Sequence, residues 1–243
     1  MRWPLKIAFV VPAYHAERTV APVVVGLLAL AATLPDTTAP AVVVVDDGST
    51  DETGRRAADA GAAVVRHAEN RGKGAALLTG FAWAREAGAR ACVSVDADGQ
   101  HPPEEALALA RHPAPPGALV LGVRDLLGAG APRKNRFSNG FSNAWMSFFA
   151  KQSLHDTQCG LRRYPLPEVL ELGLRGTGYE LESEVILKAI RRGIPVVETN
   201  VRVIYPPEHE RVTHFHSVRD PARIVARILH TAFTTRARRR AAP

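Results

Sequence analysis

Cysteine is scarce in this sequence. The 243 residues include only Cys92 and Cys159, and neither lies in the CxxC or His-rich spacing that is typical of a zinc site. We therefore expect no disulfide framework, and reduced thiols in a cytoplasm fit this composition best.

Long hydrophobic runs are also absent. The apolar stretch from Val20 to Ala32 contains Pro22 and falls short of the ~20 residues that a membrane-spanning helix requires. The first residues, MRWPLKIAFVVPAY, contain no small-residue cleavage site and do not resemble a signal peptide. We therefore expect neither a leader nor a transmembrane segment.

Most of the chain has no excess of charge of either sign. The formal net charge is +7, but residues 219–243 alone contain seven arginines and one acid, Asp220, so the first 218 residues are nearly neutral. This tail is a candidate for binding polyanions, and the alternative is an ordinary solvated end. Because the charge is confined to the tail and no RNP-like motif occurs, we expect no nucleic acid partner. The oligomeric state stays open.

Short apolar runs alternate with helical patterns from the start of the chain. Five runs rich in β-branched residues predict buried strands: Ile7–Val11, Ala41–Val45, Ala63–Val65, Ala91–Val95 and Leu119–Leu121. Helical patterns include residues 53–60, 136–150 and 181–192. The length suits one domain, and the alternation predicts an α/β fold with a Rossmann-like, doubly wound, mostly parallel sheet. Ligands of such sheets bind beyond the carboxyl ends of the strands.

Acidic residues follow two of these predicted strands. Asp46 and Asp47 come after the second, and Asp96 and Asp98 come after the fourth. A turn at the strand end can aim Asp96 and Asp98 at one hard cation, with Gln100 as a third oxygen ligand, and such a cation typically holds a diphosphate. The alternative is that these carboxylates cap the helix that begins near Pro103.

Four segments carry a resemblance to a known family. PAYHAE, VVVVDDGSTDET, ENRGKGAALLTGF and VDADGQHPPE occur in this order and resemble family 2 glycosyltransferases of the GT-A fold, especially the dolichol-phosphate mannose synthases and bacterial polyprenyl-phosphate glycosyltransferases. A nucleotide-binding dehydrogenase is disfavoured because no G-x-G-x-x-G motif follows Val11. The resemblance implies a nucleotide-sugar half over about residues 1–123 and an acceptor half over about residues 124–217. Residues 218–243 would form a basic amphipathic helix and an arginine-rich tail.

The resemblance also implies roles in the donor half. The residues that would contact or support the donor nucleotide are Pro12, Ala13, Tyr14, Glu17, Asp46, Asp47, Lys73 and Asp96. Among them Asp46 would contact the base or ribose, and Asp47 would support the turn. Asp96, Asp98 and Gln100 would bind Mg²⁺ or Mn²⁺.

Roles in the acceptor half follow from three further segments: GVRD, DTQCGLRRY and GYELESE. The candidates for acceptor binding are Arg124, Arg133, Arg136 and Arg162, since guanidinium suits a phosphate. Asp156 would lie near the donor sugar or acceptor, Glu180 and Glu182 would border the sugar, and Cys159 would be a core residue. The segment YPPEHERVTHFHSVRD departs from the mannose synthase pattern, and Arg211 and His214 are candidate replacements there, with a surface position favoured for His214 and His216.

The implied reaction is an inverting, single-displacement sugar transfer from a UDP- or GDP-sugar, with Asp96, Asp98, Arg124, Asp156 and Glu182 as the catalytic candidates. A polyprenyl phosphate or other lipid acceptor is ionised already and requires no general base. A soluble hydroxyl acceptor, which is one alternative, requires a carboxylate such as Asp156 or Glu182. The other alternative is a noncatalytic nucleotide-sugar-binding protein.

An apolar stripe marks the last predicted helix. It consists of Ile224, Val225, Ile228, Leu229, Ala232 and Phe233, and arginines flank it. This pattern predicts peripheral binding to the anionic inner face of the cell membrane, with the alternative that the helix packs on its own domain. A second contact is expected from Phe137, Phe141, Trp145 and Phe148.

Overall fold

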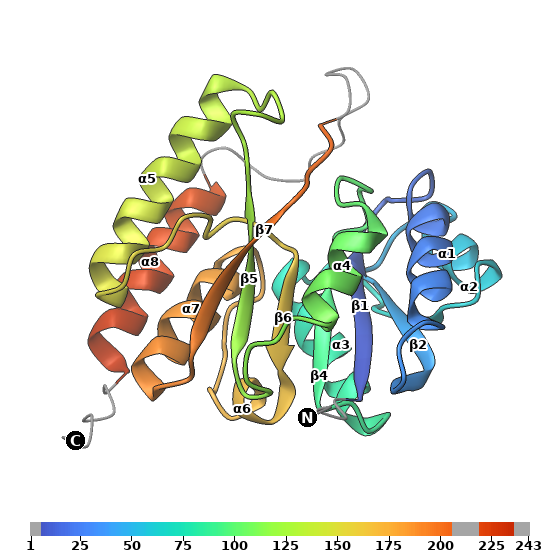
Figure 1. Cartoon of the computed structure of the whole chain (residues 1–243). Helices are drawn as coiled ribbons and strands as arrows, with labels where there is room; N and C mark the ends of the chain where they lie inside the picture. Colours follow the sequence, from blue (N-terminus) through green and yellow to red (C-terminus); the bar gives the residue numbers. More distant parts are fainter. Residues whose placement is uncertain (1–5, 206–218, 236–243) are drawn as a thin grey trace.

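Seven strands form one sheet in the order β3-β2-β1-β4-β6-β5-β7 (Figure 1). The computed structural model describes residues 6–205 and 219–235. The strands are β1 (Ile7–Ala13), β2 (Thr37–Asp46), β3 (Ala63–Arg66), β4 (Ala91–Ser94), β5 (Leu119–Arg124), β6 (Arg162–Pro165) and β7 (Val196–Val201). The helices are α1 (Val20–Ala31), α2 (Thr53–Asp59), α3 (Lys73–Glu86), α4 (Pro103–Ala110), α5 (Arg133–Ala150), α6 (Leu166–Leu170), α7 (Glu180–Arg192) and α8 (Arg219–Thr234).

The sheet is parallel except at β6. Strand β6 pairs antiparallel with both β4 and β5, and the other neighbouring strands pair in parallel. The predicted α/β class, the mostly parallel sheet and the five predicted strands are confirmed. Strands β6 and β7 were not predicted. The sequence of β6 is RRYP, and a polar run of this kind does not look like a strand, although all four residues are buried.

Helices cover both faces of the sheet and enclose two apolar cores (Figure 1). Strand β1 shows how the faces are divided, because Ala8 and Val10 join one core while Ile7, Phe9 and Val11 join the other. Helices α3, α5, α7 and α8 contribute to the first core, and α1 and α4 contribute to the second. This two-sided burial explains the continuous apolar runs in the predicted strands.

Helix α8 packs on the domain through α7 and α5. Ile228 and Thr231 are buried, Ile224 and Ala232 pack against the core, and the Phe233 ring is 82% exposed. The structure therefore shows the alternative in which the last helix packs on its own domain. Its outer side is left exposed. Across the described residues, no helix has both the length and the apolar character needed to cross a bilayer.

Candidate functional site

A cavity of about 1100 Å³ opens where β1, β2 and β4 end. The predicted site residues that line it are Pro12, Ala13, Tyr14, Glu17, Asp47, Lys73, Asp96, Asp98 and Gln100. Because parallel strands carry their carboxyl ends to one edge, residues that are far apart in the sequence meet here. The cavity is also lined by residues that the sequence did not single out, including Arg18, Asp51, Asn70 and Arg71.

The Asp47 carboxylate organises the loop before α3. It accepts hydrogen bonds from the backbone N–H groups of Arg71 (3.0 Å) and Gly72 (2.7 Å), and it lies 2.6 Å from Nδ1 of buried His67. The other ring nitrogen of His67 lies 3.0 Å from Thr79 Oγ1, so the imidazole ties the loop to α3. Asp47 was expected to support the turn after its strand, and here its carboxylate holds the loop before α3. His67 carries no motif signal, and the sequence therefore gave no reason to select it.

Asp46 is not among the residues that line the cavity. The side chain is fully buried at the end of β2, where Oδ1 accepts a hydrogen bond from the backbone N–H of Ser49. Its Oδ2 has no hydrogen-bond partner and lies 3.5 Å from Nε of Arg66. In this arrangement Asp46 shapes the turn after β2, while Asp51 reaches the cavity itself.

Asp96, Lys73 and Glu182 form a charged cluster at the cavity wall, where Glu182 is buried and the other two are partly buried. Lys73 Nζ lies 2.7 Å from Asp96 Oδ1 and 3.4 Å from Glu182 Oε1. Burial opposes the charge on Lys73, but the Asp96 and Glu182 carboxylates outweigh it and raise the pKa of this lysine above its ordinary value. Burial likewise disfavours the charged form of Asp96, but the neighbouring ammonium prevails and lowers the pKa of that carboxyl.

The chain offers a partial ligand set for a divalent cation. Asp98 and Gln100 line the cavity with Asp96, and Asp98 Oδ1 accepts a hydrogen bond from the Gln100 backbone N–H. Desolvation, reinforced by the nearby Asp96 carboxylate, raises the pKa of Asp98 to about 6. No cluster of three or more His, Cys, Asp or Glu suited to a metal occurs in the described part of the chain. Asp96, Asp98 and Gln100 offer oxygen atoms of the kind that Mg²⁺ and Mn²⁺ prefer, and an ion bound there would need further ligands from substrate oxygens or water.

Arg124 and Asp156 face each other in a two-pronged ion pair at the end of β5. The guanidinium donates through Nε to Oδ2 (2.7 Å) and through Nη2 to Oδ1 (3.0 Å), and the Arg124 backbone N–H also donates to Oδ2. Burial acts against the charged guanidinium, but the hydrogen bonds to Asp156 more than compensate and raise the pKa of Arg124. Both residues were predicted site residues, but Asp156 is fully buried and its lone pairs are engaged. Asp156 is therefore not available as a general base in this arrangement.

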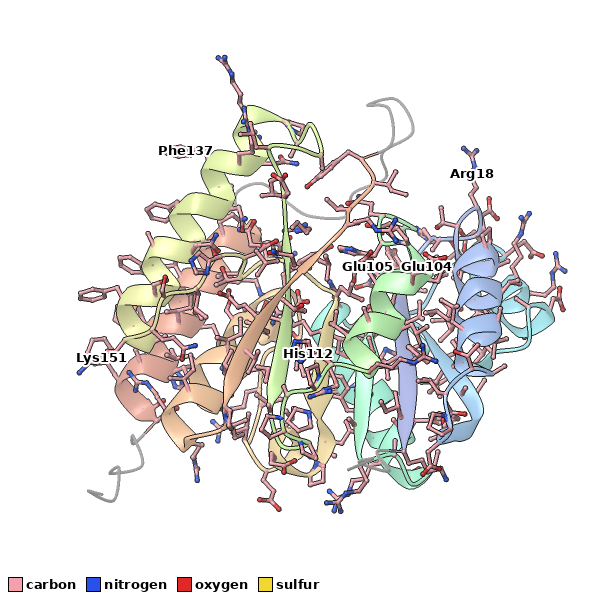
Figure 2. All side chains as sticks on the ribbon, in the orientation of Figure 1. Arg18, Glu104, Glu105, His112, Phe137 and Lys151 are labelled. Atoms are coloured by element: carbon pink, nitrogen blue, oxygen red, sulfur yellow. The ribbon has the colours of Figure 1, made fainter. Side chains whose placement is uncertain are left out.

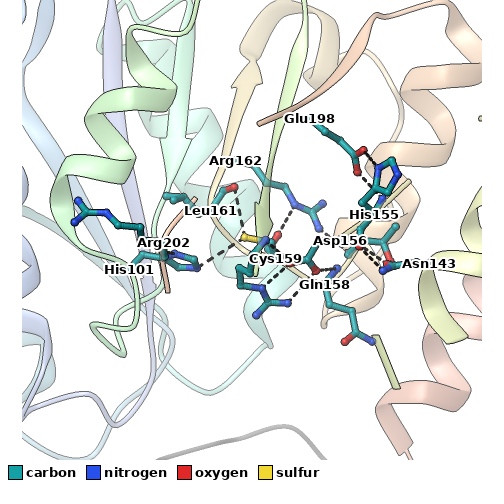
Figure 3. Close-up of polar contacts among 12 residues, drawn as sticks. His101, Asn143, His155, Asp156, Gln158, Cys159, Leu161, Arg162, Glu198 and Arg202 are labelled. Atoms are coloured by element: carbon teal, nitrogen blue, oxygen red, sulfur yellow. Dashed lines mark hydrogen bonds and ion pairs between the residues drawn. The ribbon is translucent and has the colours of Figure 1, made fainter. Parts of the chain in front are cut away.

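The loop around Asp156 is held from several elements (Figure 3). Asn143 of α5 accepts from the Thr157 N–H, Glu198 of β7 accepts from the His155 N–H, and His101 Nε2 lies 3.8 Å from Cys159 Sγ. Burial raises the pKa of the Cys159 thiol to about 12, so this cysteine is an inert core residue.

Arg162 requires a correction, because it does not reach the cavity. Its side chain is fully buried, and the guanidinium donates to the backbone carbonyls of Cys159 (2.7 Å), Glu182 (2.9 Å) and Thr157 (2.8 Å) (Figure 3). With these hydrogen bonds made, it joins the Asp156 loop to α7 and is not free to bind an acceptor. The sequence could not show this, since the motif gives no information on burial.

Arg133 and Arg136 lie on the first turn of α5, outside the residues that line the cavity. Arg133 is exposed, and Nε of Arg136 is buried without a hydrogen-bond partner. Arg211, His214 and His216 lie outside the described residues.

Helix α8 contributes part of the cavity wall. Arg219, Asp220 and Arg223 line it, although the sequence suggested only a membrane or packing role for this helix. Arg223 Nη2 donates to Glu180 Oε1 (2.7 Å), and the same carboxylate oxygen accepts from the N–H groups of Thr177 and Gly178. Glu180 was expected to border the sugar, and here it fixes the loop at the start of α7 instead.

Comparisons with known proteins agree on one family. Residues 8–165 match the family model described as glycosyl transferase family 2. The polyprenol monophosphomannose synthase of Mycolicibacterium smegmatis is 31% identical over 205 residues, which cover 79% of this chain and 75% of that protein. The undecaprenyl-phosphate mannosyltransferase of Micrococcus luteus is 26% identical over 211 residues, covering 82% and 84%.

Solved structures share the fold. The mannosyl-3-phosphoglycerate synthase of Rubrobacter xylanophilus superposes with a TM-score of 0.72 at 18% identity, over 98% of this chain and 79% of that chain. The glucosyl-3-phosphoglycerate synthase of Mycobacterium tuberculosis, in complex with Mn²⁺, uridine diphosphate and phosphoglyceric acid, gives a TM-score of 0.69 at 20% identity, over 94% and 79%. At these identities the comparison establishes the GT-A glycosyltransferase fold.

Proposed function

The chain belongs to glycosyl transferase family 2, and on this premise we propose that it moves a sugar from a nucleoside diphosphate donor to a polyprenyl phosphate. The names of the two relatives support the acceptor class, since both refer to a polyprenol-derived lipid. We propose a single displacement with inversion at the anomeric carbon, as the family implies. The transfer would take place at the inner face of the cell membrane.

One observation carries this proposal: Asp96, Asp98 and Gln100 line the same cavity as Pro12, Ala13, Tyr14 and Glu17. The second group offers a surface for the donor nucleoside, and the first group supplies oxygen ligands for a cation beside the diphosphate. Lys73 and Arg71 add positive charge to the same wall. The diphosphate leaving group of a donor bound in this way would lie near the positive charges of Lys73 and Arg71 and near the carboxylates that bind the cation.

The donor is already activated by its diphosphate, so the main catalytic requirement is to stabilise charge that develops on the leaving group. A Mg²⁺ or Mn²⁺ ion held by Asp96, Asp98 and Gln100 would supply such charge. The complexes of the M. tuberculosis enzyme with Mn²⁺ and uridine diphosphate support this cofactor class. Asp96 is kept ionised by Lys73 and so remains a competent ligand at neutral pH.

The state of the candidate bases supports a phosphate acceptor over a hydroxyl. Asp156 is engaged by Arg124, and Glu182 is buried beside Lys73. A phosphate is ionised at neutral pH and can attack without a base. We propose that Arg124 contacts that phosphate through Nη1, which takes no part in the ion pair with Asp156, and that Arg133 and Arg136 of α5 are further acceptor-binding residues.

Exposed aromatic side chains support contact with a membrane. On α5, the exposed fractions of Phe137, Phe141 and Phe148 are 79%, 59% and 74%, whereas Trp145 packs against the core. Figure 2 shows Phe137 at the same end of the molecule as Arg18, which lines the cavity. We propose that α5, together with exposed Phe233 of α8, rests on the lipid surface from which the acceptor enters.

The test is a transfer assay. Purified protein is incubated with radiolabelled UDP- and GDP-sugars, polyprenyl phosphate in detergent and Mn²⁺, and the label is then followed into the lipid fraction. We expect a labelled lipid with at least one donor and its loss in EDTA. Label that moves only to a soluble hydroxyl acceptor contradicts the acceptor class, and donor binding without turnover identifies a noncatalytic binding protein.

A further inference from the structure

Lys73 occupies an oxygen that the proposed metal also requires. It is the first residue of α3, its side chain is 15% exposed, and its Nζ lies 2.7 Å from Oδ1 of Asp96. The nearby Glu182 carboxylate, at 3.4 Å, gives the ammonium a second anionic neighbour. The aromatic ring of Tyr179 completes the surroundings, with its centroid 5.7 Å from Nζ.

The position of this lysine is built by close backbone packing. A Cβ at Gly160 would lie 2.8 Å from Lys73 Nζ and closer still to Asp96 Oδ2, so a larger residue there would have to displace the pair. On the other side, a Cβ at Gly74 would lie 2.7 Å from the carbonyl oxygen of Gly178. Asp47 fixes the preceding N–H groups of Arg71 and Gly72. Packing at Gly160 and Gly74, together with the hydrogen bonds to Asp47, therefore holds Lys73 beside Asp96.

Two cations cannot share this carboxylate equally. An ammonium ion beside Asp96 offsets the negative charge that would attract a divalent cation, and it engages one of the ligand oxygens. We propose that Lys73 is an internal counter-ion that holds Asp96 in the absence of ligand, competes with the divalent metal and is released toward the donor diphosphate when the metal binds. This inference rests on the proposed function, because it takes Asp96 as a metal ligand.

If Lys73 competes with the metal, its removal should strengthen metal binding, whereas ordinary damage to a metal site weakens it. Removal of Lys73 leaves the charges of partly buried Asp96 and buried Glu182 uncompensated, and a divalent cation can neutralise them. The Lys73→Met variant should therefore bind Mn²⁺ more tightly than the wild type, by about tenfold or more. The gain in affinity that pyrophosphate adds to Mn²⁺ binding should be smaller in this variant than in the wild type, because no lysine ammonium is present to contact the pyrophosphate.

The first experiment measures Mn²⁺ binding without nucleotide, by electron paramagnetic resonance of the free ion. Arg71→Met is the matched control, since Arg71 lines the same cavity and carries the same charge but makes no ion pair with Asp96 in the structure. We expect tighter binding for Lys73→Met and a much smaller change for Arg71→Met. If both variants bind Mn²⁺ more tightly by the same factor, the cause is the loss of positive charge from the cavity in general, and the proposal is overturned. Unchanged or weaker Mn²⁺ binding by Lys73→Met also overturns it.

A second measurement uses the wild-type protein and does not depend on the folding of a variant. Lysine acetylation is followed by mass spectrometry with and without Mn²⁺. Lys188 serves as the internal control, because its Nζ also pairs with a buried carboxylate, Glu184, at 2.7 Å, and its side chain is 12% exposed. Mn²⁺ should increase acetylation of Lys73 and leave Lys188 unchanged. If Mn²⁺ binds and Lys73 reactivity stays constant, the proposal is overturned while the metal site stands. If neither the wild type nor Lys73→Met binds Mn²⁺, both are overturned.

Discussion

At the scale of single residues, Gly160 is a position where a small change should affect activity. A methyl group there would meet the Asp96 carboxylate and the Lys73 ammonium. We expect Gly160→Ala to lower kcat/KM by about 100-fold or more, because a displacement of about 1 Å in a catalytic group has effects of this size.

Gly140→Ala is the matched control for that substitution. Gly140 lies within α5, and a Cβ there meets nothing within 4 Å. Activity should be unchanged and stability equal or slightly higher, because alanine favours a helix. Similar kinetics for the two variants, measured in the lipid transfer assay, would contradict the close packing around Asp96.

Asp98 should make both metal binding and stability depend on pH. Its pKa of about 6 in the folded protein lies above the ordinary value of 3.8. The folded state therefore binds a proton more tightly than the unfolded state, so that ionised Asp98 lowers stability above about pH 6 and this loss disappears as the pH falls toward 4. Protonation also removes a ligand, and Mn²⁺ affinity should fall by about tenfold for each pH unit below 6.

The Asp98→Asn variant tests the sign of this shift. In EDTA at pH 8 we expect its Tm to exceed that of the wild type by about 1–2 °C, and at pH 4.5 the difference should be clearly smaller. Transfer activity should be lost at both pH values. A stabilisation that is equal at pH 8 and pH 4.5 would show that the carboxylate is not perturbed.

At the scale of elements, α8 is coupled to the site through Arg223. Its guanidinium pairs with Glu180, whose carboxylate is 4% exposed and fixes the loop at the start of α7. Arg223→Met should lower the free energy of unfolding by about 1–2 kcal/mol, since it removes the partner of a buried charge. Donor binding should weaken as well, because Arg223 lines the cavity.

An exposed arginine on α2 provides the comparison. Arg55 pairs with Glu52 and Asp59, but its side chain is 62% exposed. Arg55→Met should leave the unfolding free energy almost unchanged and donor binding intact, because an exposed ion pair contributes little to stability. Urea unfolding of both variants measures the difference, and equal losses would mean that Arg223 has no special coupling role.

At the scale of the whole molecule, the exposed aromatic surface predicts how the protein meets a membrane. The combined change of Phe137, Phe141 and Phe148 to serine should weaken binding to anionic vesicles by at least about tenfold, since each exposed phenyl ring that enters lipid contributes about 1–2 kcal/mol. Val25→Ser is the control, because Val25 is 56% exposed but lies on α1. Vesicle sedimentation that is insensitive to the triple change would exclude α5 as the contact.

Local sequence was sufficient for much of this protein. The β-branched runs predicted five strands and the parallel α/β class, because short apolar segments bounded by turns have few other stable arrangements. The order of the Asp-containing motifs indicated the family, and most of the residues predicted to bind the donor line one cavity. Those residues follow strand ends, and the sheet topology brings all such ends to one edge.

Tertiary structure decided what local sequence could not encode. The motif that includes Arg162 suggests an acceptor ligand, but packing buries its guanidinium against three carbonyls. The stripe of α8 is equally suited to lipid or to a core, and only the position of α7 brings Ile228 inside and Arg223 to the cavity. Lys73 and Glu182 lie 109 residues apart in the sequence, so the contact that links Glu182 to the Lys73–Asp96 pair arises only when the chain is folded. Burial and charge pairing depend on neighbours from distant segments, and these neighbours exist only in the folded chain.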